Sequence, residues 1–391
     1  MRGNSKDQHA FLLEVFLQRR TAKYVMRKTE LTGLTGIRFY ASAVVFMTHA
    51  VEKIPGGNTL DYSRVFLESG AIAVSFFFVL SGFILTYNYE SRFRERVTFS
   101  SYVRFVWDRL ARIYPVHLLM LVIVLPIAMF SPNHPLDWSA LPFHLTLLQC
   151  WWPSASPRFF SYLNTPSWSI SCEWFFYIIA PFAMFFVLGQ GRRWVLWVLI
   201  LVYACGLAWL LIASESDSAR NHLVNWFAPS RLVEFLAGVY LARVFLVSQN
   251  LITFPYSLGM QALGIVLIIA GAIGKQYPPW LFHGGLLIVP GASLLILGLA
   301  YGHGYFVTHL SQDWVNRLGL ASFSFYMVHD PMLRALRGIF FYLDLSVDSW
   351  GVLVVLAFAV FLLAQVGALL MYRYYETALQ TRLRAARTLS G

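Results

Sequence analysis

The sequence predicts an all-α polytopic membrane protein with about ten transmembrane helices. Of its 391 residues, 58% are hydrophobic and only 13% are charged, whereas soluble domains contain about 45–50% apolar and about 25% charged residues. One soluble chain of this size cannot bury such an apolar excess. At roughly 20 residues per crossing, the apolar residues suffice for about ten membrane-spanning helices.

Ten segments are apolar enough and long enough to cross a bilayer. They comprise residues 33–53, 70–88, 113–131, 167–188, 194–213, 229–247, 257–274, 283–302, 318–340 and 350–372. A shorter apolar stretch, residues 138–152, carries tryptophans near both ends, and tryptophan concentrates at membrane interfaces. We expect this stretch to be re-entrant or interfacial and not a crossing.

The remaining segments complete a three-part organisation. Residues 1–30 mix apolar side chains with several Lys and Arg residues, which is typical of an amphipathic helix that lies on the cytoplasmic membrane surface. A merely basic tail is the alternative, and the segment lacks the pattern of a cleavable signal. We expect residues 31–376 to form the membrane domain and residues 377–391 a basic cytoplasmic tail.

The formal net charge of +11 does not indicate nucleic-acid binding, because the basic residues gather at the chain ends and between the apolar segments. With both termini in the cytoplasm, 21 Lys and Arg residues lie on the cytoplasmic side and five on the opposite side. This bias favours that orientation. The three cysteines lack C-x-x-C spacing and therefore predict neither a disulfide framework nor a metal site.

The first predicted span contains Arg38 and His49, and an ionisable group in a span is unfavourable unless it is paired or hydrated. Their separation corresponds to about 1100° of helical rotation, so both lie on one helix face, about 16 Å apart. Arginine suits phosphate because its planar fork binds two oxygens, and histidine can accept and return a proton. We expect both side chains to project into one polar passage. A snorkelling arginine and a hydrogen-bonded core histidine are the alternative.

The second span and the segment after it supply further candidates. Ser81 and Gly82 interrupt an apolar run, where small residues permit close helix packing, and Ser81 is also a possible acyl carrier. Six arginines and no lysine follow within residues 92–112. Membrane orientation alone would be served equally by lysine, so this preference favours a phosphate or nucleotide ligand, with orientation alone as the alternative.

Three later spans also contain ionisable side chains. Glu173 follows Trp168 at the outer end of the fourth span and could orient a histidine, hold an acceptor hydroxyl or neutralise an arginine, with a structural ion pair as the alternative. Arg231 and Glu234 are three residues apart, so we expect them to neutralise each other on one helix face. His329 lies in the ninth span as either a second acid/base group or a packing residue.

These motifs, in this order, resemble the integral-membrane acyltransferase-3 family, which includes O-acetyltransferases acting on bacterial exopolysaccharides, lipopolysaccharide O-antigens and Nod factors. The resemblance covers roughly residues 31–376 and rests on LTGLTGIRFYASAVVFMTHA, FFFVLSGFIL, RLARIYP, SWSISCEWFFYIIAP, RLVEFLAG, SFSFYMVHDP and YRYYE. It implies ten core spans in a bacterial inner membrane. It also implies acetyl-CoA, or a related acyl-CoA, as donor co-substrate, with no tightly bound cofactor.

The resemblance implies roles for individual residues. His49 matches the family's essential histidine, Arg38 its paired arginine, and Glu173 the glutamate of its tryptophan-rich span. The other candidates for donor or substrate contact are Ser81, Gly82, Arg109, Arg112, Trp168, Arg231 and His329. One departure is Asp330, which stands where many members carry an apolar residue.

Two classes of function follow. The first is O-acetyl transfer to a hydroxyl of an exported or lipid-linked polysaccharide, with His49 as general base and Arg38 binding the donor phosphates; a lipid or sterol acceptor would use the same machinery. The second is a transporter or flippase for a glycan, lipid or anionic solute, with the same charges lining its pathway. Such transporters often contain an internal repeat, and none is visible in this sequence.

Overall fold

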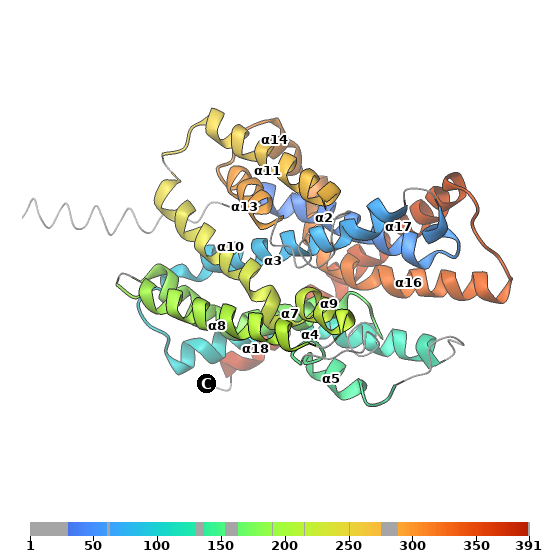
Figure 1. Ribbon diagram of the computed structural model, residues 1–391, viewed down its shortest axis with the longest axis horizontal. Coiled ribbons are helices and arrows are strands. Elements are labelled where there is room, and N and C mark those ends of the chain that lie inside the picture. The colour runs from blue at the N-terminus through green and yellow to red at the C-terminus, as the bar shows by residue number, and fades with distance from the viewer. Residues whose placement is uncertain are drawn as a thin grey trace, which may run out of the picture. The chain divides into compact units, whose positions relative to one another are not determined.

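The computed structural model describes residues 30–60, 63–129, 137–152, 163–189, 191–214, 216–249, 251–274 and 288–389. The chain divides into two units, Met1–Leu31 and Thr32–Gly391, and all the helices described below belong to the second unit. The described residues of this unit form helices and connecting turns without a β-strand (Figure 1). The predicted amphipathic helix in residues 1–30 lies almost entirely outside the described residues.

Each of the ten predicted spans contains a helix in its described residues. They correspond to α2 (Thr32–Lys53), α3 (Ser63–Phe93), α4 (Phe99–Met129), α7 (Ser167–Leu188), α8 (Arg193–Ala213), α10 (Ala228–Ser248), α11 (Phe254–Gly274), α13 (Ile288–Ala300), α16 (Ser322–Tyr342) and α17 (Trp350–Met371). Within the described residues, six helical stretches are long and apolar enough to cross a membrane, in α2, α3, α4, α7, α11 and Trp350–Ala386. The prediction of an all-α multi-pass membrane protein is confirmed.

Several shorter elements connect or extend these helices. They are η1 (Gly57–Thr59), α5 (Leu141–Thr146), α9 (Asp217–Asn225), α14 (Tyr305–Leu310), α15 (Asp313–Leu320), the π-helical turn η2 (Tyr372–Glu376) and α18 (Thr377–Leu389). The helices α10 and α16 reach the length of a span, but each carries buried ionisable side chains. Those side chains lower the mean hydropathy of the two helices.

Helix α4 begins well before the predicted span of 113–131. Its start carries a reciprocal cap in which the Thr98 amide donates to Ser101 Oγ (3.2 Å) and the Ser101 amide donates to Thr98 Oγ1 (3.3 Å). This arrangement satisfies two backbone donors at a helix start. Arg109 and Arg112 therefore lie on the body of a membrane helix and not in a loop.

The stretch 138–152 contains no helix long enough to cross a bilayer, in keeping with the expected re-entrant or interfacial segment. It contains only the short helix α5 and then packs against the start of α7. Ser171 Oγ donates to the Leu147 carbonyl (2.8 Å) and accepts from the Cys150 amide (3.2 Å). These bonds satisfy non-helical backbone groups inside the protein, which is the condition for irregular backbone at membrane depth.

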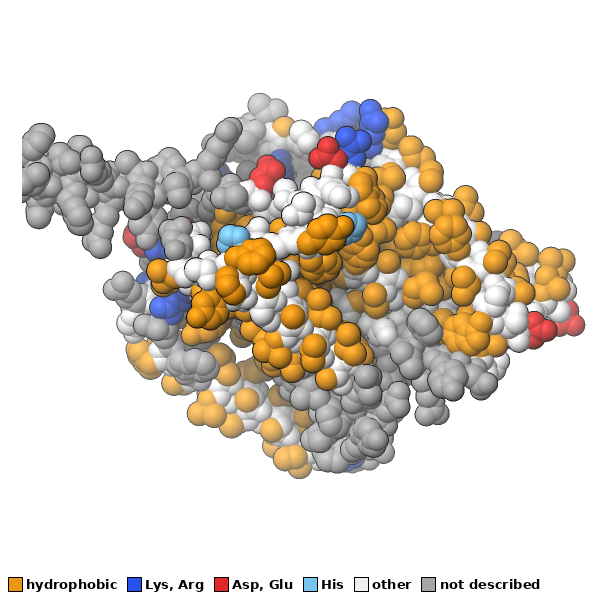
Figure 2. All heavy atoms as spheres, turned by 90° about the horizontal axis from the view of Figure 1, so that it is seen from above, with side chains coloured by type: hydrophobic (Ala, Val, Ile, Leu, Met, Phe, Trp, Pro, Cys, Tyr) orange, Lys and Arg blue, Asp and Glu red, His pale blue; other side chains and the backbone are white. Residues whose placement is uncertain are grey.

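Helix α3 lies inside the bundle, where it packs against α2, α7, α10 and α13 (Figure 1). Apolar side chains cover much of the face shown in Figure 2. Exposed examples from three different helices are Trp209 (66%), Val266 (59%) and Val355 (68%). Extended apolar faces are unfavourable in water and are expected where helices contact lipid.

The start of α2 packs against α14 and α15. A Cβ atom on Gly36 would lie 2.0 Å from the Leu310 carbonyl oxygen, and one on Gly319 would lie 2.1 Å from the Thr35 carbonyl oxygen. In addition, Asn316 Nδ2 donates to the Thr32 carbonyl (3.1 Å). Gly36 in LTGLTGIRFY and Gly319 in α15 thus allow backbones to touch directly before Arg38, which fixes the helix that carries this arginine.

Replacing Gly36 by alanine is expected to destabilise the protein by about 1–3 kcal/mol, because the added methyl group must push a backbone carbonyl away. The melting temperature of the detergent-solubilised protein measures this effect. Gly206→Ala in α8 is the matched control, since a Cβ atom there meets nothing within 4 Å. Equal melting temperatures for the two variants would contradict the close contact.

Candidate active site

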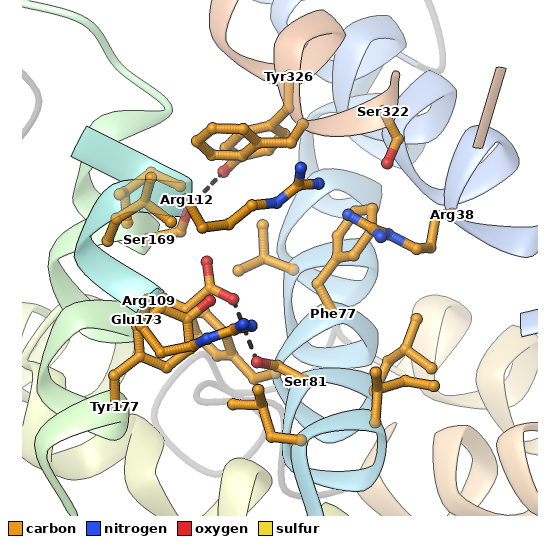
Figure 3. A pocket seen from close by; sticks show the side chains of 18 residues that line it. Arg38, Phe77, Ser81, Arg109, Arg112, Ser169, Glu173, Tyr177, Ser322 and Tyr326 are labelled. Atoms are coloured by element: carbon orange, nitrogen blue, oxygen red, sulfur yellow. Dashed lines mark hydrogen bonds between the residues drawn. The ribbon is translucent and has the colours of Figure 1, made fainter. Parts of the chain in front are cut away.

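A cavity of about 170 Å³ lies between α2, α3, α4, α7 and α16. Its polar lining, most of which is labelled in Figure 3, consists of Arg38, Ser81, Arg109, Arg112, Ser169, Glu173, Tyr177, Ser322 and Tyr326. The rest of the lining is formed mainly by Val, Leu, Ile and Phe side chains. The cavity therefore combines an apolar wall with a concentration of arginines, which is the composition of a site for an anionic organic ligand.

Two guanidinium groups face each other across this cavity. Arg38 comes from α2 and Arg112 from α4, and Figure 3 shows their nitrogen atoms pointing toward one another. Arg112 forms an ion pair with Glu376. In the described part of the chain, no ion pair reaches Arg38. An anion bound between the two groups would neutralise Arg38 and accept further hydrogen bonds from Arg112.

Glu173 lies in the same cavity and contacts the second predicted span. Ser81 Oγ donates to Glu173 Oε1 (3.1 Å), and Figure 3 shows Arg109 beside them. Arg109 itself donates to the Tyr89 hydroxyl (3.0 Å). The hydroxyl that Glu173 accepts from belongs to Ser81 and not to an acceptor, and in the described part of the chain no hydrogen bond joins Glu173 to a histidine, so its expected roles stay predictions.

Gly82 does not line the cavity. A Cβ atom at this position would lie 2.1 Å from the carbonyl oxygen of Phe235 in α10, and one on Gly238 would lie 2.0 Å from the carbonyl oxygen of Val79 in α3. The two glycines let the backbones of α3 and α10 touch, as small residues do between membrane helices. Gly82 therefore packs helices together, and the structure does not place it at the predicted donor contact.

A buried pair of histidines joins α2 and α16. His49 Nδ1 lies 2.8 Å from His329 Nε2, and the two rings stack with centroids 5.1 Å apart. His329 Nδ1 lies 3.1 Å from the Phe325 carbonyl oxygen. The structure therefore places His329 directly against the predicted base, and its roles as a second acid/base group or as a packing residue both stay predictions.

When both rings are neutral, the hydrogen bonds of this pair set where its protons lie. A carbonyl only accepts, so Nδ1 of His329 carries the proton and Nε2 of the neutral ring accepts. His49 Nδ1 must then donate to His329 Nε2, and Nε2 of His49 keeps its lone pair. In this arrangement His329 orients the His49 ring with Nε2 as its acceptor, in the way that a second group orients the base of a catalytic triad.

The structure corrects the expectation that Arg38 and His49 share one open passage. Arg38 lines the cavity and His49 does not. Between them on α2, Val45 is buried in the same apolar cluster as Tyr326. Tyr326 lines the cavity, and its ring centroid lies 5.9 Å from that of His329. Helical periodicity correctly placed both residues on one face, but it does not reveal which side chains fill the space between them.

A charged cluster that sequence analysis missed surrounds Asp330. Its carboxylate pairs with Lys53 Nζ (2.9 Å) and Arg334 Nε (2.7 Å) and accepts from the Thr165 amide (3.1 Å). Both cations also donate to Thr165 Oγ1. This cluster ties the residues before α7 to α16, beside His329. The four-residue spacing between Asp330 and Arg334 was a usable signal, whereas Lys53 is the last residue of the first predicted span and was counted among the five basic residues of the outer side.

Arg231 and Glu234 neutralise each other, as predicted. The Arg231 Nε to Glu234 Oε2 distance is 3.0 Å, and both side chains are buried. Arg231 Nη2 also donates to Ser75 Oγ (3.0 Å), and the guanidinium lies over the Trp168 ring. Neither Arg231 nor Trp168 lines the cavity, so the structure does not bring these two candidates to the ligand space.

Replacing Glu234 by glutamine is expected to lower the free energy of unfolding by about 3–5 kcal/mol, because it leaves a buried guanidinium without its carboxylate. The double variant Arg231→Met/Glu234→Leu should recover most of this loss. Melting temperatures of the purified proteins test both expectations. A Glu234→Gln protein of unchanged stability and no activity would instead give the pair a role in the reaction.

Comparison with known proteins identifies the family. Residues 31–369 match the family model described as the acyltransferase domain of acyltransferase 3. The chain belongs to the acyltransferase 3 family. It is therefore an acyltransferase, and the transporter alternative has no support. The match ends before η2 and α18.

Three relatives of this acyltransferase illustrate the family. Acyltransferase MdmB of Streptomyces mycarofaciens is 31% identical over 79% of this chain and 80% of its own length. O-acetyltransferase OatA of Staphylococcus aureus is 23% identical over 90% of this chain and 57% of its own length. YrhL of Bacillus subtilis, named as a proposed peptidoglycan O-acetyltransferase, is 25% identical over 77% and 48%. No solved structure matches the chain.

Proposed function

We propose that this acyltransferase moves an acetyl group from acetyl-CoA to a hydroxyl group of a cell-envelope glycan. Two of the relatives carry O-acetyltransferase in their names, and one name specifies peptidoglycan. The observation that carries the proposal is the histidine pair placed one side chain away from a cavity lined by arginines. The histidine pair supplies a base for the acceptor hydroxyl, and the arginine-lined cavity supplies a site for an anionic donor.

The donor would enter with its phosphates at the arginines. Arg38 and Arg112 present two guanidinium groups to one space (Figure 3), and each can form paired hydrogen bonds with phosphate oxygens. The cavity of about 170 Å³ accommodates only the reactive end of a molecule as large as acetyl-CoA. Its apolar wall suits the thioester and excludes water that would hydrolyse it.

The transfer then needs one base. Nε2 of His49 takes the proton of the acceptor hydroxyl while the hydroxyl oxygen attacks the thioester carbonyl carbon. The carbon–sulfur bond breaks, the acetyl group stays on the acceptor oxygen, and His49 returns the proton to the leaving thiolate. Tyr326 lines the cavity and lies next to His329, so its side chain would rotate and break its 2.7 Å hydrogen bond with Ser169 as the thioester reaches the histidine pair.

The acceptor side and the membrane orientation belong to the same proposal. We place both termini in the cytoplasm of a bacterium with an inner or cytoplasmic membrane, because 21 of the Lys and Arg residues then lie inside and five outside. The acceptor, a glycan or lipid-linked saccharide, would approach from the side of Asp330 and Thr165. Much of the aromatic loop expected to bind it, residues 132–166, lies outside the described residues.

Label transfer tests the proposed function. Purified protein in lipid nanodiscs is incubated with acetyl-labelled acetyl-CoA and peptidoglycan fragments or other envelope glycans. We expect labelled ester on a glycan hydroxyl and release of free coenzyme A in equal amount. Release of free coenzyme A with the label recovered only as acetate, or label on lipid alone, would contradict the glycan acceptor.

A further inference from the structure

The π-helical turn η2 has no assigned role, although its sequence YRYYE is one of the blocks that carry the family resemblance. It interrupts the helix between α17 and α18 at Tyr372–Glu376. Such turns are rare and occur frequently at functional sites. The family match ends at residue 369, so this turn lies beyond the part of the chain that the family comparison covers.

The turn η2 packs against α4 next to Arg112. Glu376 is buried, with 1% of its surface exposed, and forms an ion pair with Arg112. Its second carboxylate oxygen accepts from Ser324 Oγ (2.6 Å). One helical turn further along α4, the Pro115 carbonyl accepts from the Tyr375 hydroxyl (3.2 Å). Two consecutive residues of η2 thus hold consecutive turns of α4.

Helix α18 also packs against α4. The Trp107 indole donates to the Leu383 carbonyl (3.1 Å), and Asp108 lies 3.9 Å from Arg384. The residues expected as a basic tail, 377–391, therefore contain a helix that packs on α4 within the same unit as the membrane helices. The chain that follows α17 therefore contacts α4 from Trp107 to Pro115.

The two arginine charges at the cavity explain why a carboxylate is needed beside Arg112. Arg38 and Arg112 are like charges that face each other (Figure 3), and burying a charge without compensation is unfavourable. Glu376, which does not line the cavity, compensates the positive charge of Arg112. A guanidinium has five N–H donors, so the remaining donors of Arg112 stay directed toward the cavity and toward a ligand.

We propose that Glu376 is a positioning residue for the acyl donor, which holds Arg112 so that Arg38 and Arg112 bind one anionic part of that donor together. This inference rests on the proposed function. It assigns the π-helical turn to the donor site, although Glu376 itself does not line the cavity. Glu376 acts through Arg112 and contacts neither the donor nor the acceptor.

Binding of coenzyme A and of inorganic pyrophosphate to the purified protein, measured by isothermal titration calorimetry, tests the proposal without any transfer step. Glu376→Gln should weaken coenzyme A binding about tenfold, because Arg112 loses the charged partner that orients it. Tyr375→Phe is the matched control. It removes the other contact of η2 with α4 but leaves Arg112 paired, so binding should change less than about twofold.

The double variant separates positioning from general loosening of the turn. If Glu376 acts through Arg112, the Arg112→Ala protein and the Arg112→Ala/Glu376→Gln protein should bind coenzyme A equally. Additive losses, or equal losses in Glu376→Gln and Tyr375→Phe, would overturn the inference. Unchanged binding in Glu376→Gln would overturn this inference alone, whereas a wild-type protein that binds neither ligand would overturn it together with the proposed donor.

Discussion

Replacing His49 by alanine is expected to reduce acetyl transfer by about 10²–10⁴-fold, the usual contribution of a general base. The loss should appear in kcat, because His49 lies outside the donor cavity. The affinity for coenzyme A should remain within about twofold of the wild-type value. Label transfer measures the rate, and calorimetry measures the affinity.

The histidine pair also provides an internal comparison. His329→Ala removes the partner that orients His49 but leaves the imidazole in place, so we expect a smaller loss than in His49→Ala. The double variant should be no slower than His49→Ala, because the two groups act as a unit. Retained transfer in His49→Ala would remove this residue from the mechanism, and a loss of coenzyme A binding would show general damage to the fold.

The second large effect is expected at the cavity arginine. Replacing Arg38 by alanine should raise the KM for acetyl-CoA about 10²-fold, because a paired, charge-assisted contact to phosphate is lost in a buried site. Arg38→Lys should recover only part of this loss, since an ammonium group cannot reproduce the planar fork. Initial rates at varied donor concentration measure the change.

Arg104→Ala is the matched control for Arg38→Ala. Arg104 is an exposed arginine on α4, the helix that also carries the cavity arginines, and it does not line the cavity. Its replacement should leave the KM for acetyl-CoA within about twofold, because exposed charges contribute little. An equal rise in both variants would show that arginine affects donor binding through overall charge and not through the cavity.

The fold could be predicted largely from the sequence, because lipid requires long apolar helices and these stand out as uninterrupted runs. The boundaries were less accessible. Helix α4 extends past its apolar part to a cap formed by Thr98 and Ser101, and no apolar signal marks this extension. The amphipathic segment 1–30 stays a prediction.

The site was predicted in its residues but not in its arrangement. Spacing within one helix placed Arg38 and His49 on one face, and the neighbouring Arg231 and Glu234 were correctly paired. Contacts between helices that are distant in sequence carry no such signal. The pairing of His49 with His329 therefore emerged only from the structure.

The positions and contacts of residues at the ends of predicted spans were the hardest to predict from the sequence. Lys53, the last residue of the first predicted span, was counted on the outer side, yet it is buried with Asp330 beside the histidine pair. Glu376 was part of a recognised block, but its contact with Arg112 depends on the π-helical turn. A single sequence shows neither the change in helical register nor the helix that it approaches.

A structure of the protein bound to a thioether analogue of acetyl-CoA, determined by electron cryomicroscopy, tests the central claim most directly. We predict phosphate density between Arg38 and Arg112, a rotated Tyr326 side chain, and the acetyl end close enough to His49 for an acceptor oxygen to lie about 3 Å from Nε2. A donor bound outside the arginine-lined cavity, or one whose acetyl end stays behind an unmoved Tyr326, would contradict the account.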